Sequence, residues 1–245
     1  MKRKYLPEYQ SLSYLIDGFS SGNNLTPQAR RGSYWRNTIK VRVQDGLGSG
    51  LLLNRDGYFV TNYHILTNER VRAGSTISIP EIDYQYPVSR VLVKSRLYDL
   101  VLAQARLTDA SVPTEVVFSP HKPSPTERVR VYGYKHEVVE ERQGSMSFLQ
   151  DYSSFGAKMW RSMGVHRISN GLEDEAIRNT MYSTCEIELG WSGGPVVLES
   201  TGELIGFTKF IKTSSPNIEM VYGKHGFTSI KKLKEMIEYF LEKEE

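Results

Sequence analysis

The chain has 245 residues, of which 39% are hydrophobic and 24% are charged, and its formal net charge is +3. These values are typical of a soluble globular protein that is large enough for one large core or two small ones. The charge is too small to indicate a nucleic-acid binder, and no apolar run approaches the roughly 18 residues of a membrane helix. We therefore expect neither nucleic acid nor a membrane among the partners.

The start of the chain and the cysteine count both favour a cytoplasmic location. Residues 1–10 contain basic side chains with no apolar run behind them, so they lack the core of a secretory signal. Cys185 is the single cysteine, and one cysteine cannot form a disulfide within the chain. The histidines outside the motifs below show no metal-ligand spacing, so we expect no metal and no cofactor.

Residues 1–35 are predicted to form a helical extension that packs on the main body and is a candidate for its regulation. Apolar residues over 6–16 indicate a short amphipathic helix, which ends at a cluster of Gly, Ser and Asn. Thr26 and Pro27 then match the N-cap and the first position of a second helix.

The chain changes at Asn37 to short strands rich in β-branched and aromatic residues, separated by turn signals. The first series is predicted at residues 38–43, 50–54, 58–61, 76–79, 84–93 and 100–105. The second series is predicted at residues 128–134, 181–187, 195–198, 203–210 and 219–222. Residues 121–128, with two prolines, are the predicted linker. We expect an all-β protein in two halves, residues 36–120 and 129–228.

Two further segments complete the chain. The segment over residues 137–179 has no readable pattern, although residues 173–178 match a helix. From about Ser229, apolar residues recur at helical spacing, which predicts an amphipathic helix over residues 229–245 docked on the body.

The glycines of residues 46–50 superficially match a phosphate-binding loop. An apolar strand follows them, whereas a phosphate loop requires a helix whose first amides face the anion. We interpret them as a tight strand connection.

Three polar residues stand out at the edges of apolar segments. Ser192 lies in the sequence Gly-Trp-Ser-Gly-Gly-Pro of residues 190–195, whose glycines allow close approach of a substrate but are also typical of an ordinary turn. His64 follows an apolar strand, and a lone histidine there is commonly structural. Asp99 opens an apolar strand, where burial would be costly without a hydrogen-bond partner. His64 is the natural candidate for that partner.

Together these residues match one chemistry. A serine hydroxyl is a weak nucleophile that needs a base, and histidine is suited because its free pKa is about 6.5. A buried aspartate holds the histidine in one tautomer. The backbone amides of Gly190 and Ser192 are the candidate donors for an oxyanion at the attacked carbonyl.

The chain resembles the trypsin/chymotrypsin superfamily of serine peptidases in three segments and in the histidine between the first two. These are Gly48-Ser49-Gly50, His64, Asp99-Leu100-Val101-Leu102 and Gly190-Trp191-Ser192-Gly193-Gly194-Pro195. The order His, Asp, Ser is the order of that superfamily. The sequence over residues 56–64 is most similar to its high-temperature-requirement bacterial branch, and the resemblance covers residues 40–227. It implies two six-stranded antiparallel β-barrels, with His64 and Asp99 in the first and Ser192 in the second. The implied activity is that of a serine endopeptidase acting on proteins or peptides.

The chain departs from the family pattern beside the serine. Secreted relatives carry an acid immediately before the serine that pairs with a new amino terminus, and this chain has Trp191 there. Activation by that ion pair is therefore excluded. A bulky neighbour would bias the Leu189–Gly190 peptide toward one of two orientations, so we hypothesise a poorly formed oxyanion hole that a partner protein or the substrate orders. Only the final helix follows the peptidase unit, so no carboxy-terminal regulatory (PDZ) domain is expected.

The resemblance also implies substrate-binding residues. Glu186 lies six residues before Ser192, where trypsin-like members keep the residue that sets specificity for Lys or Arg. The alternative is that Glu186 is exposed and the pocket is small and apolar. Residues Thr208, Lys209, Phe210 and Ile211 resemble the strand that pairs with the substrate backbone. Lys209 stands where many relatives keep a serine that supports the aspartate.

Two other functions remain open. A catalytically silent peptidase fold would serve as a protein-binding module. An esterase of the α/β-hydrolase class would use Gly190-Trp191-Ser192-Gly193-Gly194 as a nucleophile elbow, but it requires a histidine after the serine and parallel strands joined by helices.

Overall fold

The computed structural model describes residues 26–108, 116–119, 123–146, 180–209 and 225–244. The described elements are α2 (Pro27–Asn37), β1 (Thr38–Val43), β2 (Gly46–Leu52), β3 (Tyr58–Thr61), α3 (Asn68–Arg72), β4 (Thr76–Ser78), β5 (Gln85–Ser95), β6 (Leu100–Ala105), β7 (Arg128–Lys135), β8 (Val138–Ser145), β9 (Thr180–Ser183), β10 (Pro195–Leu198), β11 (Leu204–Lys209), β12 (His225–Ser229) and α7 (Ile230–Glu244). The helices predicted at residues 6–16 and 173–178 and the strand predicted at 219–222 lie outside the described residues. The predicted all-β class is confirmed.

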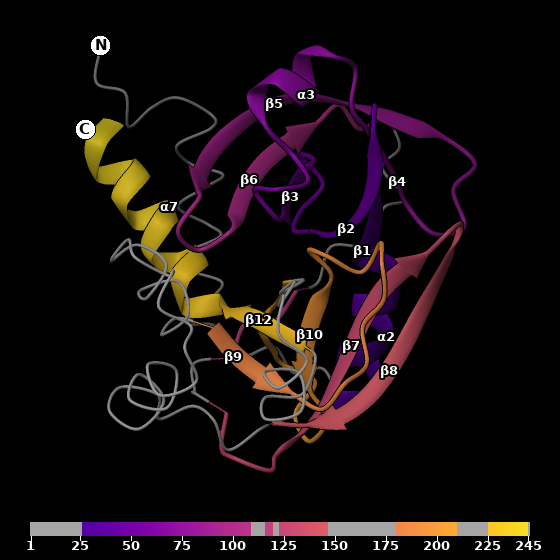
Figure 1. The fold of residues 1–245 in the computed structure, drawn as a ribbon, viewed down its shortest axis with the longest axis vertical. Helices are drawn as coiled ribbons and strands as arrows, with labels where there is room; N and C mark the ends of the chain where they lie inside the picture. The colour runs from indigo at the N-terminus through magenta and orange to yellow at the C-terminus, as the bar shows by residue number, and fades with distance from the viewer. Residues whose placement is uncertain (1–25, 109–115, 120–122, 147–179, 210–224, 245) are drawn as a thin grey trace, which may run out of the picture.

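The first sheet is a closed barrel of six strands in the order β1-β2-β3-β6-β5-β4 (Figure 1). Two register shifts against β6, between Val88 and Arg90 and between Val91 and Val93, interrupt the long strand β5. Such irregularities bend a strand and allow a sheet to close on itself. A buried cluster of aliphatic and aromatic side chains, including Ile39, fills the barrel.

The interpretation of residues 46–50 as a strand connection was wrong. These residues form the start of β2, and the connection to β1 is the turn at Gln44 and Asp45. Two of the glycines lie in crowded positions, since a Cβ on Gly48 would lie 2.8 Å from the side chain of Ile65 and a Cβ on Gly50 would lie 2.7 Å from the carbonyl oxygen of Val60. Gly46 is exposed, and a Cβ there would make only an ordinary contact of 3.7 Å with Val43.

The second sheet also has six strands, in the order β8-β7-β10-β11-β12-β9. Its two outer strands approach each other at an isolated bridge between Met146 and Ser183. The amide of Thr184 donates to the carbonyl oxygen of Ser145 at 2.9 Å beside this bridge. The sheet therefore curves until its edges meet, in agreement with the expected barrel-like second half.

Helix α2 begins as predicted and lies against the second sheet. The Thr26 hydroxyl accepts a hydrogen bond from the amide of Ala29 at 3.2 Å, and Pro27 occupies the first turn. Arg30 and Arg31 donate to the carbonyl oxygens of Thr201 and Glu199, in and beside the β10–β11 turn. The side chain of Tyr34 is fully buried, and its hydroxyl donates to the carbonyl oxygen of Val117. The described part of the predicted extension thus packs on the body.

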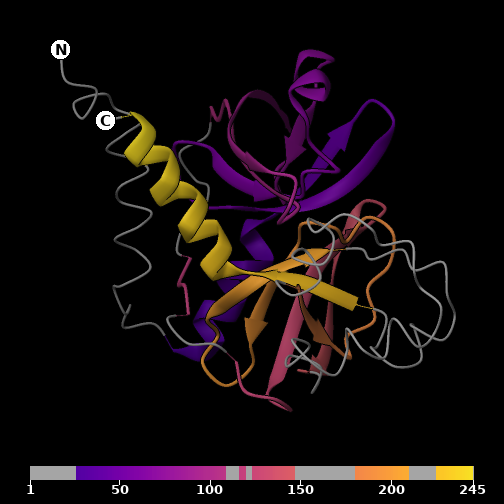
Figure 2. The same ribbon diagram turned by 60° about the vertical axis from the view of Figure 1, so that its left-hand side comes forward.

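Helix α7 confirms the predicted carboxy-terminal helix and contacts both sheets (Figures 1 and 2). Its buried side chains Leu233, Ile237 and Leu241 pack in a cluster that contains residues of the first barrel and of the second sheet, such as Val60 and Phe207. The strands in contact with α7 are β5, β11 and β12. Within the described residues, no helix has the length and apolar character that crossing a membrane requires.

Candidate functional site

His64 and Asp99 are in direct contact in the structure. The Nδ1 atom of His64 lies 2.8 Å from Oδ2 of Asp99, and the backbone amide of His64 donates to Oδ1 at 3.0 Å. His64 lies in the turn after β3, and Asp99 lies in the turn between β5 and β6. The Asp99 side chain is 14% exposed, whereas the His64 side chain is 43% exposed. One carboxylate therefore fixes both the backbone and the ring of His64, while the ring remains accessible.

Backbone contacts hold Asp99 in this position. Its φ angle is 53°, in the left-handed region that few residues other than glycine adopt, although Asp tolerates it better than most. The side chain of Asn62 donates to the carbonyl oxygen of Asp99 at 2.8 Å. Asn62 is fully buried and was not recognised from the sequence. Its place two residues before the histidine was the available signal.

Ser192 lies in the turn before β10 and is largely buried, at 7% exposure. The next residue, Gly193, has a φ of +90°, and a Cβ there would lie 2.2 Å from the carbonyl oxygen of Ser49. The same Cβ would lie 2.6 Å from Oγ1 of Thr61 and 3.1 Å from the amide of Asn62. Gly193 therefore packs directly against Thr61 and Asn62, the residues that precede His64. Among the described residues, no hydrogen bond joins the Ser192 hydroxyl to His64.

The residues before Ser192 form a tight turn. The amide of Trp191 donates to the carbonyl oxygen of Glu188 at 3.2 Å, and Gly190 has a φ of +98°. This combination matches a type II β-turn, which needs a positive φ at its third residue. In this turn the Leu189–Gly190 peptide has the orientation that gives Gly190 a positive φ, a conformation that favours glycine. Within the described part of the chain, the amides of Gly190 and Ser192 have no hydrogen-bond acceptor.

Trp191 is a core residue and not a surface residue. Its side chain is fully buried, and a Cβ on Gly133 of β7 would lie 2.7 Å from its ring atoms Cγ and Cδ2. The guanidinium of Arg142 lies 5.9 Å from the ring centroid, within cation–π range. The indole ring thereby fixes the backbone between Gly190 and Ser192.

A group of charged residues on the β7–β8 hairpin contacts the turn. Lys135 pairs with Oε2 of Glu188 at 2.8 Å, and Arg142 lies 3.3 Å from Oε1 of the same residue. The hydrogen bond from Lys135 is the main cause that lowers the pKa of Glu188, and the same bond raises the pKa of Lys135. Glu188 is the first residue of the turn, so the hairpin holds its starting point.

The residues expected to bind substrate are placed differently from one another. Glu186 is exposed, between the buried Cys185 and Ile187, as in the second of the two interpretations above. The Thr208 amide donates to the carbonyl oxygen of Gly194 at 2.8 Å, and its own carbonyl oxygen accepts from Gly193. Because these contacts use the backbone polar groups of Thr208, this residue supports the serine turn. Phe210 and Ile211 lie outside the described residues.

Lys209 is half-buried, and its Nζ atom donates to Oγ1 of Thr180 at 3.4 Å. Burial lowers the pKa of Lys209, and the negative charge of Asp99 opposes this effect. The ammonium group of Lys209 therefore interacts electrostatically with the Asp99 carboxylate that contacts His64.

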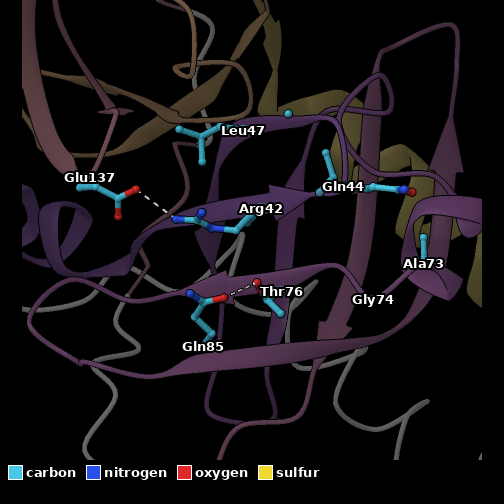
Figure 3. Close-up of a pocket in the computed structure, with 10 residues that line it drawn as sticks. Arg42, Gln44, Leu47, Ala73, Gly74, Thr76, Gln85 and Glu137 are labelled. Atoms are coloured by element: carbon cyan, nitrogen blue, oxygen red, sulfur yellow. Dashed lines mark hydrogen bonds and ion pairs between the residues drawn. The ribbon is translucent and has the colours of Figure 1, made fainter.

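A polar cavity of about 530 Å³ lies beside the turn between β1 and β2 (Figure 3). Arg42 and Glu137 form an ion pair of 3.0 Å across part of its wall. Leu47 belongs to the same wall, and its Cδ2 atom would lie 3.8 Å from a Cβ placed on Gly190. Leu47 thus lies near both the cavity and the turn that precedes Ser192, whereas His64 and Ser192 are not among the residues that line the cavity. In the described ranges, no group of three or more His, Cys, Asp or Glu side chains is arranged to hold a metal ion.

Comparison with known proteins agrees with this geometry. Residues 48–207 match the family model of the trypsin-like peptidase domain. Among solved structures, the fold is similar to that of a serine endoprotease from Yersinia pestis, with a TM-score of 0.63 and 16% sequence identity. The alignment covers 90% of this chain and 68% of that chain. No protein with a curated description matches the sequence. The antiparallel ladders of both sheets contradict the α/β-hydrolase alternative.

Proposed function

Because the chain belongs to the family of trypsin-like peptidases, we propose that it is a serine endopeptidase that acts through an acyl-enzyme intermediate. The observation that carries this proposal is the double contact of Asp99 with His64 at 2.8 and 3.0 Å. Because the carboxylate occupies Nδ1, Nε2 is the ring nitrogen that remains for proton transfer. This is the arrangement that a general base needs beside a serine nucleophile.

In the proposed reaction, Ser192 Oγ attacks the substrate carbonyl while His64 Nε2 accepts the hydroxyl proton. The carbonyl oxygen becomes an oxyanion, for which the amides of Gly190 and Ser192 are the proposed donors. The intermediate collapses when the C–N bond breaks and His64 returns the proton to the leaving amine. Water then attacks the acyl ester by the same steps, which releases the acid and restores the serine hydroxyl.

The substrate is proposed to be a protein or peptide. The family match and the accessible ring of His64 support this proposal, and the polar cavity bounded by Leu47 is a candidate for contacts with the substrate away from the reacting bond. Its walls carry backbone and polar side-chain groups that suit a peptide main chain.

We propose that the oxyanion hole is already formed without a partner protein. The closed turn at Gly190 supports this revision of the sequence-based hypothesis, because its two candidate donors lack acceptors in the described part of the chain. The expected consequence is that the isolated protein reacts with a serine-directed reagent without any added activator.

A fluorophosphonate probe tests the proposed function. Wild-type protein should form a covalent adduct, and Ser192→Ala should abolish it while the far-ultraviolet circular dichroism spectrum stays unchanged. Ser200→Ala is the matched control, because Ser200 is an exposed serine on the β10–β11 turn. Labelling that persists in Ser192→Ala would contradict the assignment of the nucleophile.

The second candidate function is a protein-binding module on a silent peptidase fold. The observation that favours it is the lack of a hydrogen bond between the Ser192 hydroxyl and His64 among the described residues. Catalytic hydrogen bonds often shorten only when substrate binds, so this geometry agrees with an enzyme as well. A folded wild-type protein that resists the probe under all conditions would support the binding module.

The exposure of Glu186 supports a pocket that does not select basic residues. Cleavage of a peptide library by wild type and by Glu186→Ala should therefore give the same preference. Loss of cleavage after Lys or Arg in the variant would favour the first interpretation of this residue.

A further inference from the structure

Ser49 makes contacts on both sides of Trp191 from the opposite half of the molecule. It lies in β2 of the first barrel and is fully buried. Its hydroxyl donates to the carbonyl oxygen of Gly190 at 2.7 Å, and its amide donates to the carbonyl oxygen of Ser192 at 2.7 Å. One residue thus holds the carbonyls of the two residues whose amides are the proposed oxyanion donors.

The surroundings of Ser49 fix the direction of its hydroxyl proton. The Oγ atom accepts a hydrogen bond from the amide of Tyr134 at 2.8 Å, so the proton is left for Gly190. The carbonyl oxygen of Ser49 accepts from Oγ1 of Thr61 at 2.7 Å. With its donors and acceptors used in this way, Ser49 has one favourable rotamer and cannot turn away from Gly190 without leaving buried polar groups unpaired.

Ser49 holds a residue whose backbone has wide conformational freedom. Glycine populates positive and negative φ about equally, so Gly190 has little intrinsic preference for the turn observed here. A hydrogen bond to its carbonyl oxygen restrains the rotation of the Gly190–Trp191 peptide. The amides of Gly190 and Ser192 flank this peptide, so its orientation determines where both donors point.

We propose that Ser49 is a positioning residue that holds the turn of residues 188–192 in the orientation that stabilises the oxyanion. The inference rests on the proposed peptidase function and goes beyond it, since Ser49 touches neither the substrate nor the reacting atoms. A hydroxyl is needed because the position must accept from Tyr134 and donate to Gly190 at once.

The test compares Ser49→Thr with Ser49→Val, which have nearly the same shape and differ in the hydroxyl. The substrate is the peptide ester that the wild-type protein cleaves fastest in a panel. On this ester, Ser49→Val should lower kcat about 10- to 100-fold, which is at most the loss caused by removing one oxyanion donor. The KM should change less than about threefold. Ser49→Thr should recover most of kcat. Ser49→Ala is the second variant without the hydroxyl, for the case in which valine does not fold.

A spectroscopic measurement separates positioning from a general loss of structure. A peptidyl trifluoromethyl ketone adds to Ser192 and turns its carbonyl oxygen into a hemiketal oxygen, whose pKa reports the strength of the oxyanion donors. That pKa, followed by carbon nuclear magnetic resonance of a labelled inhibitor, should rise in Ser49→Val and Ser49→Ala and stay near the wild-type value in Ser49→Thr. Ser89→Ala is the matched control, because the Ser89 hydroxyl also donates to a backbone carbonyl, that of Gln104, at 2.8 Å.

The outcomes are distinguishable. An unchanged hemiketal pKa and kcat in folded Ser49→Val and Ser49→Ala would overturn the role of Ser49 alone. A wild-type protein that reacts with neither the ketone nor the fluorophosphonate would overturn the proposed function and this inference together. An equal loss in the threonine and valine variants would also reject the inference, because it would show a requirement for size and not for the hydroxyl.

Discussion

The contact between Gly133 and Trp191 gives a quantitative test of how rigidly the serine turn is held. Gly133→Ala would put a methyl carbon 2.7 Å from Cγ and Cδ2 of the indole and 2.9 Å from its Cβ. Carbon atoms normally approach to about 3.5–4.0 Å, so the ring must move by about 1 Å. The contacting atoms are those nearest the backbone, so a change of rotamer cannot relieve the overlap. The backbone between Gly190 and Ser192 must move as well.

Overpacking of this kind costs about 1–3 kcal/mol. For a chain of this length, each kcal/mol lowers Tm by about 2–4 °C, so we expect a decrease of about 2–12 °C in thermal unfolding followed by circular dichroism. Fluorophosphonate labelling of Ser192 should slow in the same variant. Gly32→Ala in α2 is the control, since no atom lies within 4 Å of its Cβ position. It should stabilise the protein by about 0.5–1 kcal/mol.

A double-mutant cycle identifies the cause. In a Trp191→Ala background, where the ring is absent, the change Gly133→Ala should cost much less than in the wild type. The same cost in both backgrounds, or a Tm of Gly133→Ala equal to that of the wild type, would refute the assignment of Trp191 as the residue that fixes the turn.

Three further predictions concern titration and catalysis. Burial raises the pKa of Cys185 to about 11, so the native thiol should resist thiol reagents at pH 8. Because the unfolded thiol ionises first, stability should fall by about 3 kcal/mol as pH rises from about 9 to about 11, and urea titrations of Cys185→Ala should lack this part of the loss. Burial lowers the pKa of Lys209, so charging this lysine costs more free energy in the folded state than in the unfolded state. Lys209→Met removes that cost and should therefore have a higher free energy of unfolding than wild type at pH 7. An unchanged midpoint of urea denaturation would contradict this prediction. Asp99→Asn should lower kcat on the order of 10⁴-fold, because the ring of His64 loses its preferred tautomer, while KM changes little in steady-state assays; near wild-type kcat would reject the pairing as functional.

Most strands of the first barrel were predictable because they alternate or run through apolar residues between clear turn signals. Strand β2 is the exception, since it begins at Gly46 and not at the predicted residue 50. Three strands have the predicted bounds, at residues 38–43, 58–61 and 100–105. Their ends were readable because Gly, Asp or Asn residues such as Gly57, Asn62 and Asp99 lie next to them. Strand β8 was not predicted, because Glu140, Glu141 and Arg142 give it the composition of a solvated loop. It is a strand because it pairs along its whole length with β7. Strand β12 was missed as well, because its five residues include a glycine and two hydroxyl residues.

The candidate site shows a similar division. The order of His64, Asp99 and Ser192 along the chain was sufficient to select them, because their chemistry is specific. Ser49 and Asn62 could not be selected in this way, since their importance lies in hydrogen bonds to backbone groups that are far away in sequence. A sequence pattern records local geometry, and these contacts exist only after the two halves have come together.

Helices α2 and α7 each pack on the half of the molecule that is distant from them in sequence, and this affects how the protein unfolds. Helix α2 precedes the first barrel but binds the β10–β11 turn of the second sheet, and α7 follows the second sheet but packs on β5 of the first. Each half is therefore completed by a segment that the other half supplies. Neither half can melt while the other keeps its full set of contacts, so calorimetry should record a single cooperative transition. The same exchange limits any change in the separation of the two halves, and therefore any change in the distance between the His64–Asp99 pair and the serine turn.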